Sequence, residues 1–414
     1  MEIPINKNKP LIMHVDLNSC FATIEQQANP LLRGKPIGII PYPGESSIII
    51  APSIEAKRYG IKTGMSVREA KMLYPGLITR LPDPAKYRDV HVKFSRIFKS
   101  YSPDVVPKSI DEAVLDFSGM ENLNPDLIKI AMEIKKRMKE EIGEWILCSI
   151  GISTNRFLAK LAASLHKPDG LDIIDHSNLL DVYRKAKLLD LNGINVRYEA
   201  RLNSAGIFTT IDFYNADLDT LKRQVFQSIV GYYWFLRLRG FEPDKVLFKT
   251  KSIGNDYALK IATDDMAELS KLLMKLSEKM GRRLRKHNFT AHGIHVGLIY
   301  RDGTYWHRGR MMEREMFTTD ELYKKVLLVF NQQPERKPVS NIGISCYALE
   351  KKEYFQESMF DMDNKMEKIQ TAMDEVNDRY GEYVLTPALM MGMKDTILDR
   401  VPFGSTKEIE DLYV

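Results

Sequence analysis

Two adjacent carboxylates, Asp111 and Glu112, begin a segment that alternates like a β-strand, SIDEAVLDF at 109–117. A third carboxylate, Asp16, ends an apolar segment at 11–17 that is typical of a buried strand. Burying such a carboxylate is costly unless an opposite charge or a metal ion pairs with it. If the three meet at one edge of a sheet, they form an oxygen-rich site suited to Mg²⁺ and to phosphoryl transfer. At this point, unrelated surface acids near turns remain the alternative.

The segments around these acids predict an α+β fold with a mainly antiparallel sheet. Residues 172–240 are expected to be helical, and residues 252–350 to alternate strands with helices. A further helix is expected at 364–381. In the first part of the chain, strands are expected at 11–17, 36–42, 46–52 and 145–153, and helices at 19–30, 54–75 (two short helices broken by Gly60 and Gly64), 87–101, 127–143 and 155–170.

The composition is that of a globular intracellular protein. The chain has 414 residues, of which 44% are hydrophobic and 28% charged, so two to four domains are expected. Apolar runs of 18 or more residues are absent from the sequence, and its N-terminal stretch does not resemble a signal peptide. The three cysteines lie far apart, which argues against disulfides and zinc sites. We therefore expect a cytoplasmic protein without a membrane partner.

The charge is distributed unevenly along the chain. Residues 351–414 carry 8 Lys and Arg against 14 Asp and Glu, a net charge of −6. Since the whole chain has a net charge of +5, residues 1–350 carry +11. A basic body favours a polyanionic partner, although an uneven solvated surface would also explain the asymmetry.

The acidic constellation lies within four motifs that resemble those of the Y-family translesion DNA polymerases, in the same order along most of the chain. HVDLNSCFATIEQQANPLLRGKPIGI at 14–39 resembles the first metal-binding motif of that family, and SIDEAVLDF the second. SIGISTNRFLAKLAASLHKPDG at 149–170 resembles the third, and KSIGNDYAL at 251–259 resembles the start of the family's little-finger domain. Together they make the explanation by unrelated surface acids improbable.

This resemblance assigns roles to individual residues. It implies two Mg²⁺ ions, replaceable by Mn²⁺, with Asp16, Asp111 and Glu112 as catalytic metal ligands and Leu17 as a ligand through its backbone carbonyl. Phe21 would exclude a ribose 2′-hydroxyl. The triphosphate of the incoming deoxynucleotide would contact Lys160. A core aromatic and a solvated helix lysine are the alternatives for these last two residues.

The segment SIEAKRYG at 53–60 departs from the common family pattern. Many members have a Tyr and an Arg, three residues apart, that hold the triphosphate, and this chain has Ile54 and Lys57 there. Lys57 can still supply a positive charge, but it lacks the bidentate geometry of Arg. By the same register, Ile50 would lie near the nascent base pair and Ser53 could reach phosphate. These departures leave the triphosphate contacts of this segment open.

Asn18 stands where DinB-type enzymes carry a second Asp. Together with the EAK form at 55–57, it gives a weak lean toward the UmuC-type branch.

Two further segments are candidate DNA contacts. NGIN at 192–195 resembles the turn of a helix-hairpin-helix, in which backbone amides near Gly193 and Asn195 would bind a DNA phosphate. Asn195 replaces the usual second Gly there and tolerates positive φ. The second segment is the basic run GRRLRKH at 281–287, together with the Arg- and aromatic-rich stretch at 300–310. An ordinary helix–helix turn and a charged helix end are the alternatives. The candidate side chains of the basic run are Arg282, Arg283 and Arg285.

The tail contains QESMFD at 356–361, which resembles the clamp-binding peptide of bacterial family members. Gln356, Met359 and Phe360 fit that pattern, with Met where Leu is usual. Two exposed apolar side chains in an acidic segment suit recognition by a pocket on the sliding clamp. The alternative is that they pack the tail onto its own domain.

The sequence is therefore identified as a member of the Y family, with a right-hand polymerase architecture. The expected activity is low-fidelity, primer-template-directed DNA synthesis from dNTPs in translesion synthesis and repair, without proofreading. We expect a monomer that an accessory subunit could join; a catalytically silent DNA- or clamp-binding relative and a palm-type nucleotidyl cyclase are the alternatives. The expected domains are the palm (1–28 and 82–171), fingers (29–81), thumb (172–240), linker (241–251), little finger (252–350) and acidic tail (351–414).

Overall fold

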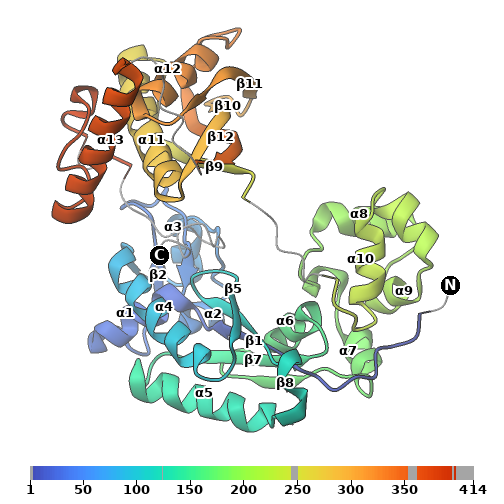
Figure 1. Cartoon of the computed structure of the whole chain (residues 1–414). Coiled ribbons are helices and arrows are strands. Elements are labelled where there is room, and N and C mark those ends of the chain that lie inside the picture. The colour runs from blue at the N-terminus through green and yellow to red at the C-terminus, as the bar shows by residue number, and fades with distance from the viewer. Residues whose placement is uncertain (1–2, 124, 244–249, 353–360, 394–395, 398–414) are drawn as a thin grey trace. The chain divides into compact units, whose positions relative to one another are not determined.

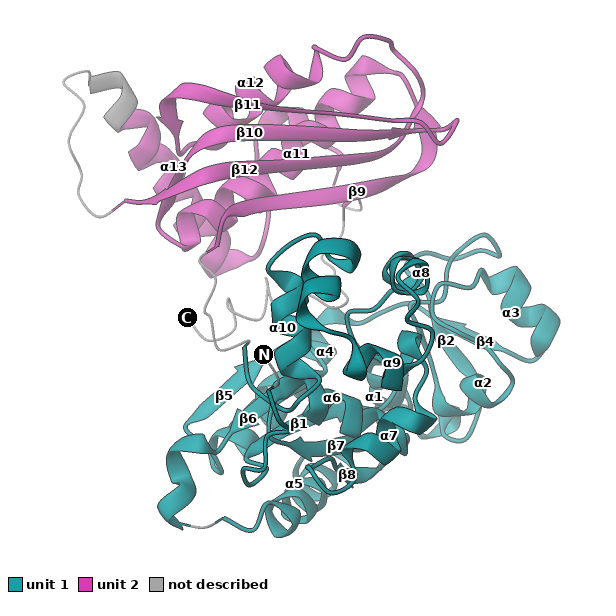
Figure 2. Ribbon diagram, turned by 90° about the vertical axis from the view of Figure 1, so that its right-hand side faces the viewer, with its two compact units in different colours: residues 1–246, 400–414 teal, residues 247–399 magenta. Residues whose placement is uncertain are grey.

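The computed structural model describes residues 3–123, 125–243, 250–352, 361–393 and 396–397. The chain divides into two compact units (Figure 2). Unit 1 comprises residues 1–246 and 400–414, and unit 2 comprises residues 247–399. The predicted α+β class is confirmed, since both units combine sheets with helices.

A five-stranded sheet forms the centre of unit 1, in the order β5-β6-β1-β7-β8 (Figure 1). Its neighbouring strands are antiparallel except for β7 and β8, which are parallel. The strand that carries Asp16 is therefore in the middle of the sheet, beside the strand that begins at Glu112. The strands are β1 (Ile12–Leu17), β5 (Asp104–Pro107), β6 (Glu112–Asp116), β7 (Cys148–Ser153) and β8 (Leu171–Ile173).

Strand alternation divides the residues of β1 between two different environments. Met13 and Val15 join the main core, whose helices are α1, α4 and α5, whereas His14 and Asp16 point to the opposite face, where α6 lies. The contact of α6 with the sheet is close: a Cβ at Gly151 would come within 2.0 Å of the Ala159 carbonyl oxygen. These helices are α1 (Cys20–Ala28), α4 (Pro84–Lys99), α5 (Leu127–Glu141) and α6 (Arg156–Leu165).

A small sheet in the order β3-β2-β4 follows α1 in the chain. The predicted strand at 46–52 is mostly wrong, because only Ala51–Pro52 pairs with β2 as a strand. Residues 47–49 bond instead to the turn before α3, where Ile49 N–H donates to the Met65 carbonyl at 2.8 Å. Gly60 and Gly64 separate the two short helices as predicted, at φ of 82° and 90°. The elements are β2 (Ile37–Ile39), β3 (Ala51–Pro52), β4 (Ile78–Arg80), α2 (Ile54–Arg58) and α3 (Val67–Leu73).

The segment after β8 is helical, as predicted, and has its own core around Phe213 and Trp234. Trp234 also packs edge-on against Phe157 of α6, with ring centroids 5.2 Å apart, which joins this helical segment to the central sheet. Its helices are α7 (Leu179–Lys185), α8 (Val196–Ser204), α9 (Thr210–Asn215) and α10 (Val230–Arg237).

Unit 2 is a four-stranded antiparallel sheet in the order β11-β10-β12-β9, with α11 and α12 on one face (Figure 2). The core between them contains Leu276, Ile294, Val326 and Ile344. The helix predicted in the tail is present as α13 and packs beside α11. The elements are β9 (Ser252–Thr263), β10 (Phe289–Tyr300), β11 (Tyr305–Met316), β12 (Val339–Lys351), α11 (Met266–Lys286), α12 (Thr319–Phe330) and α13 (Asp361–Tyr380).

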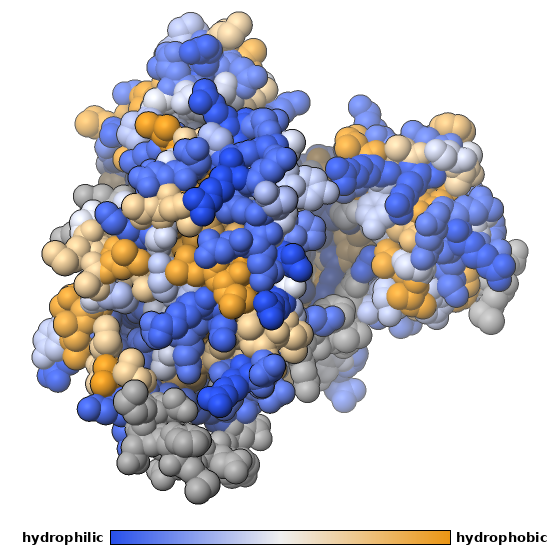
Figure 3. All heavy atoms as spheres, turned by 90° about the horizontal axis from the view of Figure 1, so that it is seen from above, coloured by the Kyte–Doolittle hydropathy of each residue, from blue (hydrophilic) through white to orange (hydrophobic). Residues whose placement is uncertain are grey.

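Hydrophilic side chains cover much of the face shown in Figure 3, with apolar ones scattered between them. Among the helices of the described residues, none combines the length and apolar character that crossing a membrane would require.

Candidate active site

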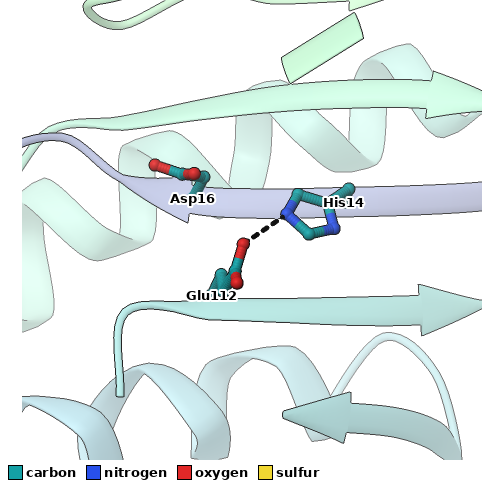
Figure 4. A group of neighbouring side chains, drawn as sticks. All are labelled: His14, Asp16 and Glu112. Atoms are coloured by element: carbon teal, nitrogen blue, oxygen red, sulfur yellow. Dashed lines mark hydrogen bonds and ion pairs between the residues drawn. The ribbon is translucent and has the colours of Figure 1, made fainter. Parts of the chain in front are cut away.

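The three predicted carboxylates converge at one end of β1 and β6. Asp16 and Glu112 are direct partners in the antiparallel register, and Figure 4 shows their side chains on neighbouring strands. Asp111 immediately precedes β6, where its carbonyl accepts the Leu17 N–H at 2.9 Å. The pairing expected from the sequence is therefore a direct consequence of the strand register.

Glu112 is held by two cationic or polar partners on the α6 face of the sheet. His14 Nε2 lies 3.1 Å from one carboxylate oxygen (Figure 4), and Lys160 Nζ lies 2.7 and 2.9 Å from the two oxygens. Burial alone would raise the pKa of Glu112, but His14 and Lys160 together lower it to about 2. Glu112 therefore stays ionised at neutral pH.

Asp111 has the opposite electrostatic environment. Burial, together with the charges of Asp16 and Glu112, raises the pKa of Asp111 to about 6, although a hydrogen bond from the Ser109 hydroxyl opposes the rise. Two adjacent carboxylates therefore differ in pKa by their surroundings alone. A nearby cation would relieve the cost of ionising Asp111.

The donor atoms suit a hard divalent cation. Among the described residues, one group has three potential ligand atoms of the His, Cys, Asp and Glu types within 4.8 Å of one another: His14, Asp16 and Glu112. Asp16 and Glu112 supply the carboxylate oxygens of this group, and Asp111, directly before Glu112 in the chain, supplies another carboxylate nearby. Carboxylate oxygens are the ligands that Mg²⁺ prefers.

A pocket of about 430 Å³ opens beside these carboxylates. Asp16, Leu17 and Asp111 are among its lining residues, and α2 contributes Lys57 and Arg58. The pocket lining thus combines carboxylates with basic side chains, which suits a metal-bound polyphosphate. Its remaining lining residues are Asn18, Ser19, Cys20, Phe21, Ile50, Ala51, Pro52, Ile54, Thr63, Lys167 and Pro168.

Lys167 is a pocket residue that the sequence analysis missed. Its Nζ lies 2.7 Å from Asp16 Oδ1. The predicted triphosphate ligand, Lys160, pairs with Glu112 and is not among the pocket-lining residues. The signal that could have identified Lys167 was its place in the loop sequence HKPDG, directly after the helix of the third motif.

Lys57 shares the pocket with Lys167. Burial and the positive charge of Lys167 lower the pKa of Lys57, while Asp16 and Asp111 act in the opposite direction. Lys57 is thus within electrostatic range of Lys167, Asp16 and Asp111. Lys57 therefore remains a candidate substrate ligand.

Phe21 lies in the pocket wall, and its ring is supported from behind. It stacks on Tyr87 of α4 with ring centroids 4.3 Å apart and an interplanar angle of 8°. Both rings are almost fully buried. Phe21 is therefore both a core aromatic and a residue of the pocket wall, and the exclusion of a ribose 2′-hydroxyl stays a prediction.

Of the other candidate residues near α2, two line the pocket and one is buried in the interior. Ile50 and Ile54 line the pocket with apolar surface. Ser53 is buried and its hydroxyl caps α2 by accepting the Ala56 N–H, so the expectation that it could reach phosphate is wrong. The Ser53 hydroxyl caps the start of α2 and is therefore not available to a phosphate.

The turn at 192–195 differs from the prediction in one respect. Gly193 has a φ of 102°, and a Cβ there would lie 3.2 Å from Trp234, so glycine is required. Asn195 has a φ of −105° and caps α8 by accepting the N–H groups of Arg197 and Tyr198. Its role here is helix capping, which does not use a tolerance of positive φ.

The arginines of the basic run on α11 have partners inside unit 2. Arg285 pairs with Asp374 of α13 and is only 5% exposed, and Arg282 donates to Asp378 at 2.7 Å. Arg283 donates to the Gly254 carbonyl at 3.2 Å. The structure thus favours a role in packing for Arg282, Arg283 and Arg285 over a free DNA-binding surface. The candidate clamp-binding residues Gln356, Met359 and Phe360 lie outside the described residues.

Comparison with known proteins agrees with this geometry. The model of the impB/mucB/samB family matches residues 15–164, and the model of its C-terminal domain matches residues 250–359. DNA polymerase IV of Pelotomaculum thermopropionicum is 32% identical over 94% of this chain and 97% of its own length. DNA polymerase IV of Moorella thermoacetica is 31% identical over 92% of this chain and 96% of its own length.

Solved structures show the same fold. A Y-family DNA polymerase chimera of Dbh and Dpo4 covers 82% of this chain and 99% of its own, with a TM-score of 0.72 and 24% identity. An insertion ternary complex of Dbh DNA polymerase covers 81% of this chain and 98% of its own, with a TM-score of 0.56 and 24% identity.

The fold and the carboxylate site define a DNA-directed DNA polymerase of the right-hand, translesion class. The chain belongs to the impB/mucB/samB family of Y-family polymerases. Its curated relatives are DNA polymerase IV proteins, which places it with the DinB-type enzymes, so that the lean toward the UmuC-type branch is minor.

Proposed function

We propose that Asp16, Asp111 and Glu112 hold two divalent cations, Mg²⁺ or the substitute Mn²⁺, with the Leu17 carbonyl as a further ligand. When bound, such cations neutralise phosphate charge and stabilise the attacking and leaving oxygens of an in-line displacement. His14 and Lys160 hold Glu112 ionised and oriented for this purpose. The primer 3′-hydroxyl and the α-phosphate of a dNTP would meet beside these carboxylates.

The triphosphate of the dNTP would lie between α2 and the loop that carries Lys167. Lys57, Arg58 and Lys167 line that part of the pocket and supply positive charge for it. Phe21, fixed by its stack on Tyr87, would exclude a ribose 2′-hydroxyl by steric contact. A triphosphate contact by Lys160 stays a prediction, and Lys167 is the stronger candidate because it lines the pocket and Lys160 does not.

The single observation that carries this proposal is the direct register pairing of Asp16 with Glu112 beside a pocket lined by basic side chains. The test is primer extension with Mg²⁺ by Asp111→Ala, alongside primer–template binding measured by fluorescence anisotropy. We expect extension to be lost and binding to be retained. Asp89→Ala, at an exposed acid on α4, is the matched control. Extension by Asp111→Ala at the wild-type rate would show that the metal assignment is wrong.

The thumb and the little finger would bind DNA, and the tail would bind the clamp. We propose the same domains as in the sequence analysis, with duplex DNA bound by the thumb at Gly193 and Asn195 and by the little finger. We further propose that Gln356, Met359 and Phe360 bind a sliding clamp. A pull-down of the clamp with the full chain and with Phe360→Ala tests this, and equal capture by both would contradict it.

The family also suggests what the enzyme does in the cell. We propose a monomeric, low-fidelity enzyme without proofreading that copies damaged templates in the cytoplasm. Single-nucleotide insertion opposite an abasic site and opposite an undamaged base, with each dNTP in turn, measures both the bypass and the error rate.

A further inference from the structure

The side chain of Asn18, the residue after β1, binds the backbone of the loop that carries Lys167. Asn18 is 4% exposed, and its Oδ1 accepts the Asp169 N–H at 2.7 Å. Its Nδ2 donates to the Ser149 hydroxyl of β7 at 3.0 Å. One amide group therefore links the central strand, its neighbour and the loop.

Ser149 and Lys135 hold the same loop through further hydrogen bonds. The Ser149 hydroxyl also accepts the Gly170 N–H at 3.3 Å. Lys135 of α5 donates to the backbone carbonyl and to the carboxylate of Asp169, each at 2.7 Å. The backbone on the C-terminal side of Lys167 is thus held by β1, β7 and α5 together.

Asn18 is only two residues after Asp16, so one short segment positions both a catalytic carboxylate and the loop opposite it. Lys167 Nζ lies 2.7 Å from Asp16, and both residues line the pocket. A lysine is a flexible point charge, so where it can act depends on where its backbone is held. The anchor of the loop therefore determines where that charge lies.

We propose that Asn18 is a positioning residue for the incoming nucleotide, acting through Lys167 on the triphosphate. This inference rests on the proposed function, in which Lys167 contacts that triphosphate. Asn18 would lower the KM for every dNTP alike, because it holds a phosphate contact that all four nucleotides share. It would have less effect on the chemical step, because the hydrogen bonds of its side chain go to Ser149 and Asp169 and not to the catalytic carboxylates.

The choice of substitutions follows from the hydrogen bonds. Asn18→Ala leaves the partly buried Asp169 N–H without its acceptor, which frees the loop. Asn18→Asp keeps an acceptor for that N–H, and the Ser149 hydroxyl, already 3.3 Å from Oδ1, can donate to the other carboxylate oxygen. Asn18→Asp is therefore the conservative variant that should restore function.

The experiment is single-nucleotide insertion on an undamaged primer–template, with KM and kcat measured separately and the melting temperature recorded. We expect Asn18→Ala to raise the KM for dNTP about tenfold and to change kcat less than about threefold, with primer–template affinity unchanged. Asn18→Asp should stay within about twofold of the wild type in both constants. A fall in kcat and melting temperature at unchanged KM, or an equal KM defect in Asn18→Asp, would overturn the proposal.

A double-mutant cycle tests the path through Lys167. Lys167→Ala should raise the KM at least as much as Asn18→Ala, and the double variant should match Lys167→Ala alone. If the two effects multiply, Asn18 does not act through Lys167 and the inference fails. If Lys167→Ala leaves the KM unchanged, the proposed role of Lys167 fails first, which distinguishes the two failures.

Discussion

At the scale of single residues, the carboxylates are arranged for cation binding at a cost in stability. The pKa of Asp111 is raised from an ordinary value of 3.8 to about 6, so the folded chain holds this proton more tightly than the unfolded chain does. Stability must therefore fall as the pH rises from about 4 through about 6. We expect Asp111→Asn to raise the free energy of unfolding at pH 8 without divalent cations by up to about 2 kcal/mol. The melting temperature should rise accordingly.

The same comparison at pH 5 provides the control. Asp111 is then mostly protonated in the folded chain, so the advantage of Asp111→Asn should shrink. Adding Mg²⁺ at pH 8 should stabilise the wild type more than the variant, because a bound ligand stabilises only the state that binds it. A melting temperature of Asp111→Asn below that of the wild type at pH 8 would contradict this account.

The sequence was sufficient to predict the carboxylates but not the basic side of the site. Asp16, Asp111 and Glu112 stand at strand ends, and strand pairing alone brings them together. Strand pairing does not show which of Lys160 and Lys167 lies in the pocket, because both belong to the third motif. Their different partners, Glu112 and Asp16, depend on the face of α6 and on the path of the loop after it, which strand periodicity does not specify.

At the scale of elements, the stack between α1 and α4 should control sugar selection. Removing the ring of Tyr87 leaves space behind Phe21, so Tyr87→Leu is expected to raise incorporation of rNTPs relative to dNTPs by about tenfold. Tyr87→Phe keeps the stack and should retain wild-type selectivity. Competitive single-nucleotide insertion measures the ratio, and an unchanged ratio in Tyr87→Leu would show that Phe21 does not depend on this support.

The contact of α13 with α11 gives a second prediction at this scale. Arg285 is 5% and Asp374 17% exposed, so Asp374→Ala leaves a buried charge without its partner. We expect a loss of about 3 kcal/mol in urea unfolding, with little change in primer–template affinity. Asp378→Ala breaks the bond to Arg282 at a carboxylate that is 73% exposed, and should cost less than about 1 kcal/mol. A large loss of DNA affinity in Asp374→Ala at unchanged stability would favour the DNA-binding role expected from the sequence.

Most elements could be predicted from periodicity, and the errors have physical causes. The amphipathic helices α5 and α11 and the buried strands β1 and β7 follow the expected patterns. The segment at 46–52 was mistaken for a strand because it is rich in apolar residues, of which Ile49 packs inward from a loop and Ile48 is exposed. The arginines of α11 were interpreted as a free surface because the position of the acidic α13 beside them depends on tertiary packing.

At the scale of the whole molecule, the charge distribution predicts how DNA binding depends on salt. Residues 1–350 carry a net charge of +11, and part of the acidic tail is paired internally through α13. Arg308 and Arg310 on β11 are exposed, in the Arg- and aromatic-rich stretch identified from the sequence. Because they are exposed, they are better candidates for phosphate contacts in unit 2 than the arginines of α11, which have partners inside the unit.

Removing one side chain that binds a DNA phosphate lowers the slope of log Kd against log salt concentration by about 1, because fewer counterions are released from the DNA. We therefore expect the double variant Arg308→Ala and Arg310→Ala to bind primer–template more weakly and with a slope lower by about 2. Anisotropy titrations between about 50 and 200 mM salt measure both quantities. Lys324→Ala, on α12 where Lys324 pairs with Asp320, is the matched control and should leave the slope unchanged. An unchanged slope in the double arginine variant would place the DNA contacts of unit 2 on another face of its sheet.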